Sequence, residues 1–365
     1  MLRIDRRSVQ HFDWMLITLT VLLVVIGFIN LLSSTHALGE LSNEARRQLI
    51  SLGLGTIVMI VTATIDYRHF ERFALPVYGA SLLLLGLTLV IAPMTRGSQS
   101  WILEGRLQPA ELAKVGMILA LSRYFARNPP GEIQALRDLI RPALIIGGPV
   151  GLILLQRDMG VALLTLLIGC TYLGFVHIPW RAWLAVAVLG VATLATAWFF
   201  MFQPYQRNRI LDLIDPGRDP LASGYQVNQS IIAIGSGGLF GKGWMEGTQT
   251  QLRFLPTQHT DFAFSVLAEE WGFFGSVLVL GVYLSFLIWG LIVARSSKDG
   301  FGAMLAIGVV GIFFWPAVLN VGMVLGLAPV IGVPLPFIAY GGSALVACLI
   351  AVGLLLNVSI RRYVF

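Results

Sequence analysis

The stretch FDWMLITLTVLLVVIGFINLL, residues 12–32, decides the fold. A helix needs ~20 consecutive apolar residues to cross the hydrocarbon core of a bilayer, and this stretch supplies them. It is too long for the apolar core of a signal peptide, and no small-residue cleavage pattern follows it. We therefore expect it to form the first transmembrane helix.

Similar apolar runs recur along the whole chain of 365 residues. Hydrophobic residues make up 56% of it, charged residues only 12%, and the mean hydropathy is +0.80, whereas a soluble domain carries about a quarter charged residues. The further runs lie near 49–65, 73–93, 109–125, 138–155, 159–178, 180–202, 262–294, 302–325 and 337–359. Because only helices satisfy the backbone in such segments, the sequence predicts an all-α polytopic membrane protein, one domain over residues 1–365 with about ten transmembrane helices.

The net charge of +6 does not indicate a nucleic-acid-binding protein, because many arginines lie in short segments between apolar runs. With an even number of spans both termini share one side of the membrane, and the segments on that side hold most of the Arg and Lys residues. The positive-inside rule then predicts a multi-pass protein of the cytoplasmic (inner) membrane with both termini in the cytoplasm. It also places the long loop 203–260 on the outer, extracytoplasmic face, where a loop of this length is usually functional.

The two cysteines, Cys170 and Cys348, both lie inside apolar runs. We expect small core residues without a disulfide between them. Metal-binding Cys/His spacing is absent from the sequence, and the glycine-rich IGSGGLFGKGW (234–244) fits neither the P-loop nor the dinucleotide-binding spacing. ATP and NAD are therefore not expected as ligands, and the glycines are expected to allow tight turns or close helix packing.

A carboxylate stands between the long loop and a later span, in LPTQHTDFAFSVLAEE (255–270). Asp261 suits two roles. It can lie in the first turn of a helix capped by Thr260, where the helix dipole favours an acid, or it can be a catalytic group. The polar neighbours Gln258 and His259 favour the catalytic role.

Two adjacent acids, Glu269 and Glu270, follow on the same predicted helix. At about 1.5 Å per residue they lie roughly 12–14 Å beyond Asp261 on a straight helix, so they cannot share a proton with it. Adjacent acids near membrane depth are expected to face a wet cavity or a cation. The alternative is an interfacial segment in which both acids are solvated.

Basic residues mark two other places. Glu111 and Lys114, three residues apart, are expected to pair on one helix face. Such a pair can have a structural role and join two spans, or it can present Lys114 to an anion in an aqueous cavity. The residues alone favour the structural role.

In the long loop, Arg207 and Arg209 suit phosphate oxygens, and together with Lys242 they indicate an anionic substrate.

The stretch GVPLPFIAYGGSALV (332–346) predicts a broken segment at membrane depth. Pro334 and Pro336 stop a helix, and the glycines at 341 and 342 allow close backbone approach. Irregular backbone at this depth is tolerated where it lines a cavity.

Together these motifs resemble the SEDS family (shape, elongation, division and sporulation proteins). Four blocks match in order and spacing: LQPAELAK (107–114), RILDLIDPGRDPLASGYQVNQSIIAIGSGGLFGKGW (209–244), GTQTQLRFLPTQHTDFAFSVLAEEWGFFG (247–275) and NVGMVLGLAPVIGVPLPFIAYGGSALV (320–346). The form FGKGW followed by GTQTQL and FLPTQHTDF is closer to the rod-shape branch of the family than to its division branch. The resemblance covers nearly the whole chain.

Two blocks depart from the family pattern. GSQSWI (97–102) has Ser100 where the family often has a basic residue, which weakens any claim about substrate contacts of that loop. QRDMG (156–160) has Arg157 in place of a proline and keeps Asp158. This second change is expected to alter how the fifth span ends.

The resemblance implies a peptidoglycan glycosyltransferase with ten spans that polymerises lipid II at the outer face of the cytoplasmic membrane. It implies as partner a class B penicillin-binding protein, a transpeptidase, within the elongasome that maintains rod shape. It also implies Asp261 as the essential residue and Arg47, Glu111 and Lys114 as matching functional positions.

The implied chemistry needs a base for the 4-hydroxyl of the acceptor N-acetylglucosamine, cations for the departing pyrophosphate and an apolar groove for the lipid. Asp261 is the candidate base, with His259 beside it, and attack on the α-linked donor gives a β-1,4 bond with inversion. The candidates for pyrophosphate contact are Arg47, Lys114, Arg207 and Arg209. No cofactor is certain, and a divalent cation, Mg²⁺ or Mn²⁺, near Asp261 is a candidate.

Two alternatives remain at this point. Intramembrane Glu111, Lys114 and the acids at 269–270, together with a broken helix, would also suit a lipid II flippase, although the polar groups concentrate on the outer side. A non-catalytic scaffold for cell-wall synthases would leave glycan synthesis intact when Asp261 is replaced.

Overall fold

The structure is a computed structural model that describes residues 12–35, 41–94, 97–103, 105–128, 136–176 and 223–362, with a few isolated positions between 180 and 211. Within these residues the regular structure is helical, apart from one isolated bridge between Ile102 and Leu107. The elements are α2 (Trp14–Ser34), α3 (Asn43–Thr64), α4 (Tyr67–Ile91), α5 (Pro109–Arg127), η2 (Leu136–Leu139), α6 (Ile140–Leu155), α7 (Met159–Cys170), η3 (Thr171–Phe175), α10 (Ser223–Ser236), α11 (Thr248–Gln251), α12 (Ala263–Arg295), α13 (Gly300–Val324) and α14 (Gly342–Arg361).

Nine of the ten predicted apolar runs coincide with these helices, and the tenth, 180–202, lies mostly outside the described residues. In the described part of the chain, six helices are long and apolar enough to cross a membrane: α2, α3, α4, α12, α13 and α14. The predicted all-α polytopic architecture is confirmed.

Short polar residues set where several apolar helices begin. Asp13 Oδ1 accepts a hydrogen bond from the Leu16 N–H at 3.1 Å to start α2, and Ser42 Oγ accepts one from the Ala45 N–H at 3.1 Å to start α3. The same arrangement starts α4, α7 and α13 with Asp66, Asp158 and Asp299. Apolar composition therefore predicts each helix, and the capping residue fixes its first turn.

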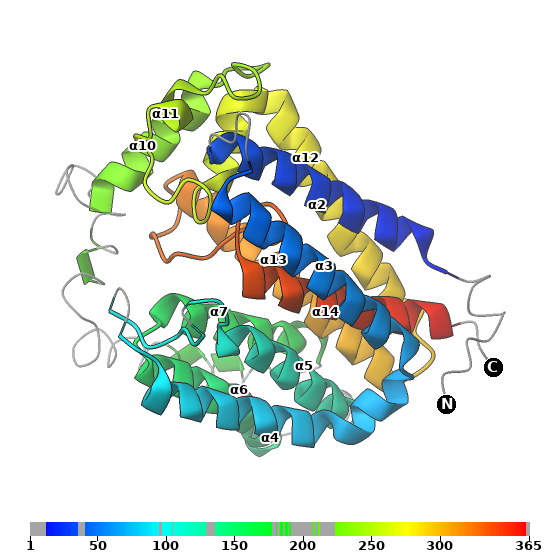
Figure 1. The fold of residues 1–365 in the computed structure, drawn as a ribbon. Coiled ribbons are helices and arrows are strands. Elements are labelled where there is room, and N and C mark those ends of the chain that lie inside the picture. The colour runs from blue at the N-terminus through cyan, green and yellow to red at the C-terminus, as the bar shows by residue number, and fades with distance from the viewer. Residues whose placement is uncertain are drawn as a thin grey trace.

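Helices α13 and α14 form the interior of the molecule. Their most apolar windows are 72% and 83% buried, against 17% and 22% for α3 and α4. Helix α14 packs along α3, and α13 packs against α5 and α12, whereas α4, α5, α6 and α7 lie together in the lower half of Figure 1. Because α3 and α4 are apolar but largely uncovered by protein, we interpret them as lipid-facing.

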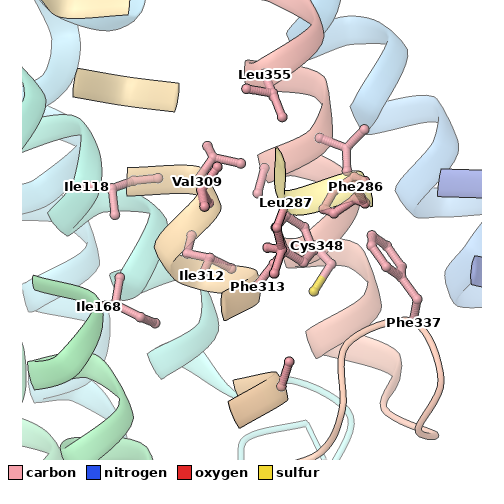
Figure 2. Packing of buried hydrophobic residues seen from close by; sticks show 14 of the residues in the cluster. Ile118, Ile168, Phe286, Leu287, Val309, Ile312, Phe313, Phe337, Cys348 and Leu355 are labelled. Carbon is pink, nitrogen blue, oxygen red and sulfur yellow. The ribbon is translucent and has the colours of Figure 1, made fainter. Parts of the chain in front are cut away.

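Aromatic packing anchors an irregular segment, 331–341, between α13 and α14. Phe313 of α13 meets Phe286 of α12 edge-on with ring centroids 4.9 Å apart, and Phe337 of the segment stacks on Phe313 at 5.2 Å (Figure 2). Such pairs contribute about 0.5–1.5 kcal/mol beyond the area they bury. The predicted broken segment is therefore present and is fixed to the core. Cys348 is buried beside it, and neither Cys348 nor Cys170 forms a disulfide, as predicted.

The two ends of the helix bundle differ in what they gather. At one end, Ser359 Oγ at the end of α14 donates to Asp13 before α2, and Tyr67 Oη donates to Asp299 Oδ2 at 2.6 Å. The other end gathers the end of α2 and the start of α12 with α10 and α11 beside them (Figure 1). The candidate site lies at this second end.

Helix α12 is interrupted near its start. Gly272 has φ 67° and ψ −164°, a conformation that only glycine adopts readily, so a short helix at 263–271 precedes the long one. A Cβ added to Gly272 would collide with the backbone nitrogen of Gly241. The described part of the long loop, from residue 223, contains α10 and α11, and α10 packs against α12 and α13.

Candidate active site

Asp261 lies just before α12, and its backbone is fixed from inside the protein. Asn320 of α13 donates through Nδ2 to the Asp261 carbonyl oxygen and to the Val333 carbonyl oxygen, each at 2.7 Å. The Asp261 side chain is half-buried, and a Cβ placed on Gly332 would lie 3.5 Å from Asp261 Oδ2. Asn320 thus joins the backbone of Asp261 to the 331–341 segment, and the carboxyl group faces that segment.

The interpretation of this stretch as a capped helix start is wrong. The N-cap position of α12 is Phe262, which has no side-chain cap, and Asp261 precedes it. Thr260 Oγ1 donates instead to the Thr257 carbonyl oxygen at 3.2 Å. Thr260 therefore does not cap α12, and Asp261 lies before its first turn.

Two further contacts hold the residues before Asp261. The Tyr340 N–H donates to the His259 carbonyl oxygen at 2.8 Å, and the two rings lie 5.8 Å apart. Gln258 Nε2 donates to the carbonyl oxygen of Ser34, at the end of α2, at 2.7 Å. Residues 258–261 are consequently held by α2, α13 and the 331–341 segment.

The same 331–341 segment lines a pocket that contains the Glu111–Lys114 pair. Lys114 Nζ donates to Glu111 Oε1 at 2.8 Å, and both side chains are buried in the first turns of α5. The pocket has a cavity volume of about 40 Å³, and Tyr340 is among its lining residues. The predicted pairing is confirmed, and the pair lies at a pocket wall.

Lys114 retains hydrogen-bonding capacity. Its ammonium carries three hydrogens, and among the described residues Glu111 is the one acceptor that they meet. A buried ammonium with unused donors is unfavourable unless a further acceptor is present. An anion in the pocket would supply that acceptor.

A third carboxyl group, Asp158, lies close to this pair. Gln108 Nε2, at the start of α5, lies 3.4 Å from Asp158 Oδ2, and Asp158 caps α7. Burial raises the pKa of Asp158, and the nearby charge of Lys114 opposes that rise. A Cβ on Gly160 would collide with the Ile331 carbonyl oxygen. The starts of α5 and α7 therefore also border the 331–341 segment.

Both departures from the family pattern have a structural setting. Arg157 has φ 62° at the end of α6, a conformation that proline cannot adopt because its ring fixes φ near about −65°. Ser100 is buried, and the Gln99 N–H beside it donates to the Gln156 carbonyl oxygen at 3.0 Å. The loop that contains Ser100 thus packs against the same turn.

The three arginines predicted to contact pyrophosphate differ in where they lie and in whether the structure describes them. Arg47 is exposed in the first turns of α3, and the neighbouring Gln48 Oε1 accepts from the Gly341 N–H at 3.3 Å, which brings this turn beside the end of the 331–341 segment. Arg207 is half-buried at one of the isolated described positions. Arg209 lies outside the described residues.

The metal candidate gains no ligand cluster from the described residues. No group of three or more His, Cys, Asp or Glu side chains in this part of the chain could hold an ion. Mg²⁺ is commonly bound by one or two carboxylates together with substrate phosphates, so a cation on Asp261 would need a bound substrate to complete its shell. It stays a prediction.

The adjacent acids Glu269 and Glu270 are both buried, so the solvated alternative is wrong. Glu269 faces a cation, as predicted: Lys242 Nζ lies 2.7 Å from Glu269 Oε1. Lys242, one of the residues that indicated an anionic substrate, is therefore paired within the protein. Glu270 points to another neighbour and accepts a hydrogen bond from Ser33 of α2.

Some contributors to the site were not predicted from the sequence. Asn320 is a lone amide in an otherwise apolar helix, and because buried polar groups are nearly always hydrogen-bonded, it could have been singled out as a bridging residue. Tyr340 acts through its backbone N–H and Gln48 through its side-chain oxygen, each on the backbone of a distant segment, and the sequence has no signal for such contacts.

Comparison with known proteins agrees with this geometry. A family model described as "Cell cycle protein" and covering FtsW, RodA and SpoVE matches residues 13–364. Peptidoglycan glycosyltransferase MrdB of Escherichia coli K12 is 37% identical over 357 residues, which cover 96% of this chain and 94% of that protein. Among solved structures, a chain of a peptidoglycan synthase complex that coordinates polymerization and crosslinking matches with a TM-score of 0.81 and 36% identity, over 97% of this chain and 99% of that one. The rod shape determining protein RodA of Thermus thermophilus matches with a TM-score of 0.72 and 33% identity, over 96% and 98%. The chain belongs to the FtsW/RodA/SpoVE family of cell cycle proteins, the SEDS family that its motifs resemble.

Proposed function

We propose that this protein is a peptidoglycan glycosyltransferase that polymerises lipid II into β-1,4 glycan strands, with inversion, during cell elongation. The similarity to the E. coli and T. thermophilus proteins supports this function. One observation carries it: Asp261, the Glu111–Lys114 pair and the first turns of α3 all border the 331–341 segment. A base and cationic groups around one irregular segment suit the transfer of a sugar from a pyrophosphate carrier.

In the proposed reaction Asp261 accepts the proton of the acceptor's 4-hydroxyl group. That oxygen attacks C1 of the donor sugar, the bond between C1 and the phosphate oxygen breaks, and undecaprenyl pyrophosphate leaves with the electron pair. Attack from the face opposite the leaving group turns the α linkage into a β linkage, so no covalent enzyme intermediate is needed. The two hydrogen bonds from Asn320 support this role, because they fix the backbone that carries the base.

We assign Lys114 to the pyrophosphate of the donor. Glu111 balances its charge when the pocket is empty, and the remaining N–H donors are available to phosphate oxygens. Arg47, exposed beside the end of the 331–341 segment, is the second candidate for this contact. Arg207 and Arg209 remain proposals for the long loop, and His259 is proposed to contact substrate beside Asp261.

The chain is a membrane protein with several spanning helices, and we place both of its termini in the cytoplasm and its site at the outer face. Positively charged residues at the end opposite the site support this orientation, among them Arg68, Arg123, Lys298 and Arg361. We further propose a class B penicillin-binding protein as partner within the elongasome. The similarity to a chain of a peptidoglycan synthase complex supports this partner.

The test is reconstitution of the protein with its transpeptidase partner in vesicles that contain lipid II, with glycan formation and lipid movement measured on the same sample. The proposal expects glycan from the wild-type complex and none from Asp261→Ala. Lipid movement without glycan would instead identify a flippase, and wild-type glycan formation by Asp261→Ala would identify a scaffold.

A further inference from the structure

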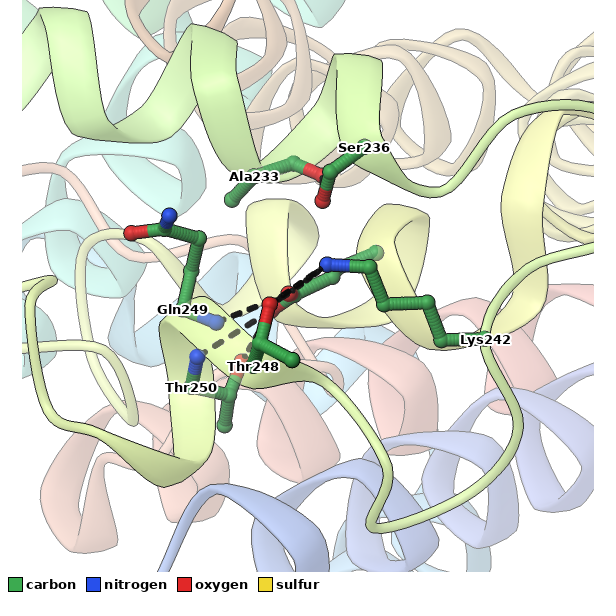
Figure 3. A network of polar contacts seen from close by, with 7 residues as sticks. Ala233, Ser236, Lys242, Thr248, Gln249 and Thr250 are labelled. Atoms are coloured by element: carbon green, nitrogen blue, oxygen red, sulfur yellow. Dashed lines mark hydrogen bonds and ion pairs between the residues drawn. The ribbon is translucent and has the colours of Figure 1, made fainter.

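The Glu269 carboxylate holds the polypeptide segment that leads to Asp261. Its oxygens accept hydrogen bonds from Lys242 Nζ at 2.7 Å, the Gln249 N–H at 2.8 Å, and both the N–H (3.1 Å) and Oγ1 (2.8 Å) of Thr250. Figure 3 shows Lys242, Gln249 and Thr250 converging on one point from different parts of the loop. The side chain of Glu269 is 0% exposed. A buried carboxylate is thereby satisfied by one cation and several donors of the 242–260 segment.

The glycine-rich run packs directly on the backbone around this carboxylate. The Lys242 N–H donates to the Glu269 carbonyl oxygen at 3.1 Å, and the Gly243 N–H donates to the Glu270 carbonyl oxygen at 3.0 Å. A Cβ on Gly241 would collide with the Glu270 carbonyl oxygen. These glycines therefore allow close backbone approach to the short helix 263–271 and do not form a phosphate-binding loop.

Both ends of the 242–260 segment are fixed to that same short helix. One end is bound at Glu269, and the other continues through Asp261 into the first turn of α12. Between them, Met245, Arg253 and Thr257 have φ of 64°, 56° and 51°. A non-glycine residue in this left-handed region costs about 1–2 kcal/mol, so the segment needs external contacts to keep its path. Glu269 supplies them at the end remote from Asp261.

We propose that Glu269 is a positioning residue for Asp261: by holding the 242–260 segment, it keeps the carboxyl group of Asp261 where the acceptor hydroxyl binds. This inference rests on the proposed function, because it takes Asp261 as the base. Lys242 then neutralises a buried carboxylate and is not a substrate ligand. Glu270, which binds Ser33 of α2, holds the same short helix against a different neighbour.

The experiment compares Glu269→Gln with Asp13→Asn in the purified complex with its transpeptidase partner. Asp13 is a matched control, because it is also buried, accepts from Leu16, Trp289 and Ser359, and lies at the opposite end of the bundle. Small displacements of a reacting group lower rates by up to about 100-fold, so we expect Glu269→Gln to lower kcat about 10- to 100-fold with KM unchanged. Asp13→Asn is expected to lower thermal stability while it leaves kcat unchanged.

A second readout does not depend on activity. Arg253 is exposed within the 242–260 segment, so trypsin cleavage after it reports how firmly the segment is held. Faster cleavage is expected in Glu269→Gln and wild-type cleavage in Asp13→Asn. The charge-reversed pair, Lys242→Glu with Glu269→Lys, is expected to remain impaired, because a lysine cannot accept from the amides of residues 249 and 250.

The outcomes separate this inference from the proposed function. If Asp261→Asn abolishes synthesis while Glu269→Gln keeps the wild-type kcat, the positioning role is overturned and the function stands. Equal loss of kcat in Glu269→Gln and Asp13→Asn, or recovery in the charge-reversed pair, also overturns it. Wild-type synthesis by Asp261→Asn overturns both. Should Glu269→Gln not fold, the double variant Lys242→Met/Thr250→Val weakens the same network, and an unchanged kcat in that variant contradicts the positioning role.

Discussion

Two lysine–carboxylate pairs in the described part of the chain have similar lengths and different surroundings. In the Lys242–Glu269 pair, at 2.7 Å, the fully buried carboxylate accepts from several protein donors and the lysine is 24% exposed. In the Glu111–Lys114 pair, at 2.8 Å, the lysine is buried at a pocket wall and Glu111 is its one described acceptor. Burial of charge alone therefore does not identify a site. The two pairs differ in the hydrogen-bonding capacity that the described residues leave unused, and on this difference we assign Lys114, and not Lys242, to the substrate.

Among the variants that test this comparison of the two pairs, the largest effect is expected from Lys114→Met. It removes the donors assigned to pyrophosphate, for which a loss of about 10²–10³ in kcat is typical of a lost electrostatic contact. It also leaves the Glu111 carboxylate buried without its cation, which costs about 3–5 kcal/mol. Glycan synthesis and thermal unfolding of the purified complex measure the two losses.

The double variant Lys114→Met/Glu111→Gln separates these two losses. Because it removes both charges, stability is expected to return toward the wild-type value. Glycan synthesis is expected to remain lost, since no donor meets the pyrophosphate. A double variant that regained synthesis would show that the pair is structural and would remove the contrast between the two pairs.

A smaller effect is expected from Asn320→Leu. The variant loses the two hydrogen bonds that Asn320 Nδ2 donates to the carbonyl oxygens of Asp261 and Val333, each worth about 0.5–1.5 kcal/mol. Because the backbone that carries the base is then no longer fixed, kcat should fall. Asn357→Leu is the matched control: Asn357 is also buried and donates to two carbonyl oxygens, those of Thr62 and Ile65, at the other end of the bundle. Asn357 Oδ1 also accepts from the Tyr67 N–H and from Arg361 Nη1, so melting curves should show at least as large a stability loss for Asn357→Leu, whereas kinetics should show a lower kcat for Asn320→Leu alone. Equal kcat values in the two variants would argue against a role of Asn320 in the site.

The smallest effect is expected from Lys242→Met. Glu269 keeps its bonds to the amides of residues 249 and 250, so the variant loses the two hydrogen bonds that Lys242 Nζ donates, one to Thr248 Oγ1 and one to Glu269, the latter worth about 1.5–3 kcal/mol. Its melting temperature should therefore lie above that of Lys114→Met, and its glycan synthesis should remain close to wild type. If Lys242→Met had the lower melting temperature and the lower rate of glycan synthesis of the two lysine variants, the two pairs would have been assigned to the wrong roles.

Local features of the molecule could be predicted from the sequence. The apolar runs predicted nine described helices, the spacing of Glu111 and Lys114 predicted their pairing, and Pro334 with Pro336 predicted the broken segment. In each case the physical cause lies within a few residues of the chain, because helix length, i, i+3 contact and helix termination are short-range effects.

Contacts between distant segments could not be predicted in this way. Lys242 and Glu269 are 27 residues apart, and Asn320 and Asp261 are 59 apart, so their meeting depends on how whole helices pack. The acids at 269 and 270 illustrate the difference: their position near membrane depth predicted a wet cavity or a cation. The lysine that Glu269 meets follows from the interruption at Gly272 and the approach of the glycine-rich run, and Glu270 meets Ser33 instead. Family resemblance singled out Asp261, but the contacts that hold it came from the structure.

The most direct test of the account measures lipid II binding and glycan synthesis on the same purified complex, with wild-type protein and Asp261→Asn. The asparagine keeps the size of the side chain and cannot accept the proton of the acceptor hydroxyl. We predict unchanged lipid II binding and a loss of synthesis of about 10²–10⁴-fold, the range expected for removal of a general base. Synthesis at the wild-type rate by Asp261→Asn would contradict the assignment of Asp261 as the base.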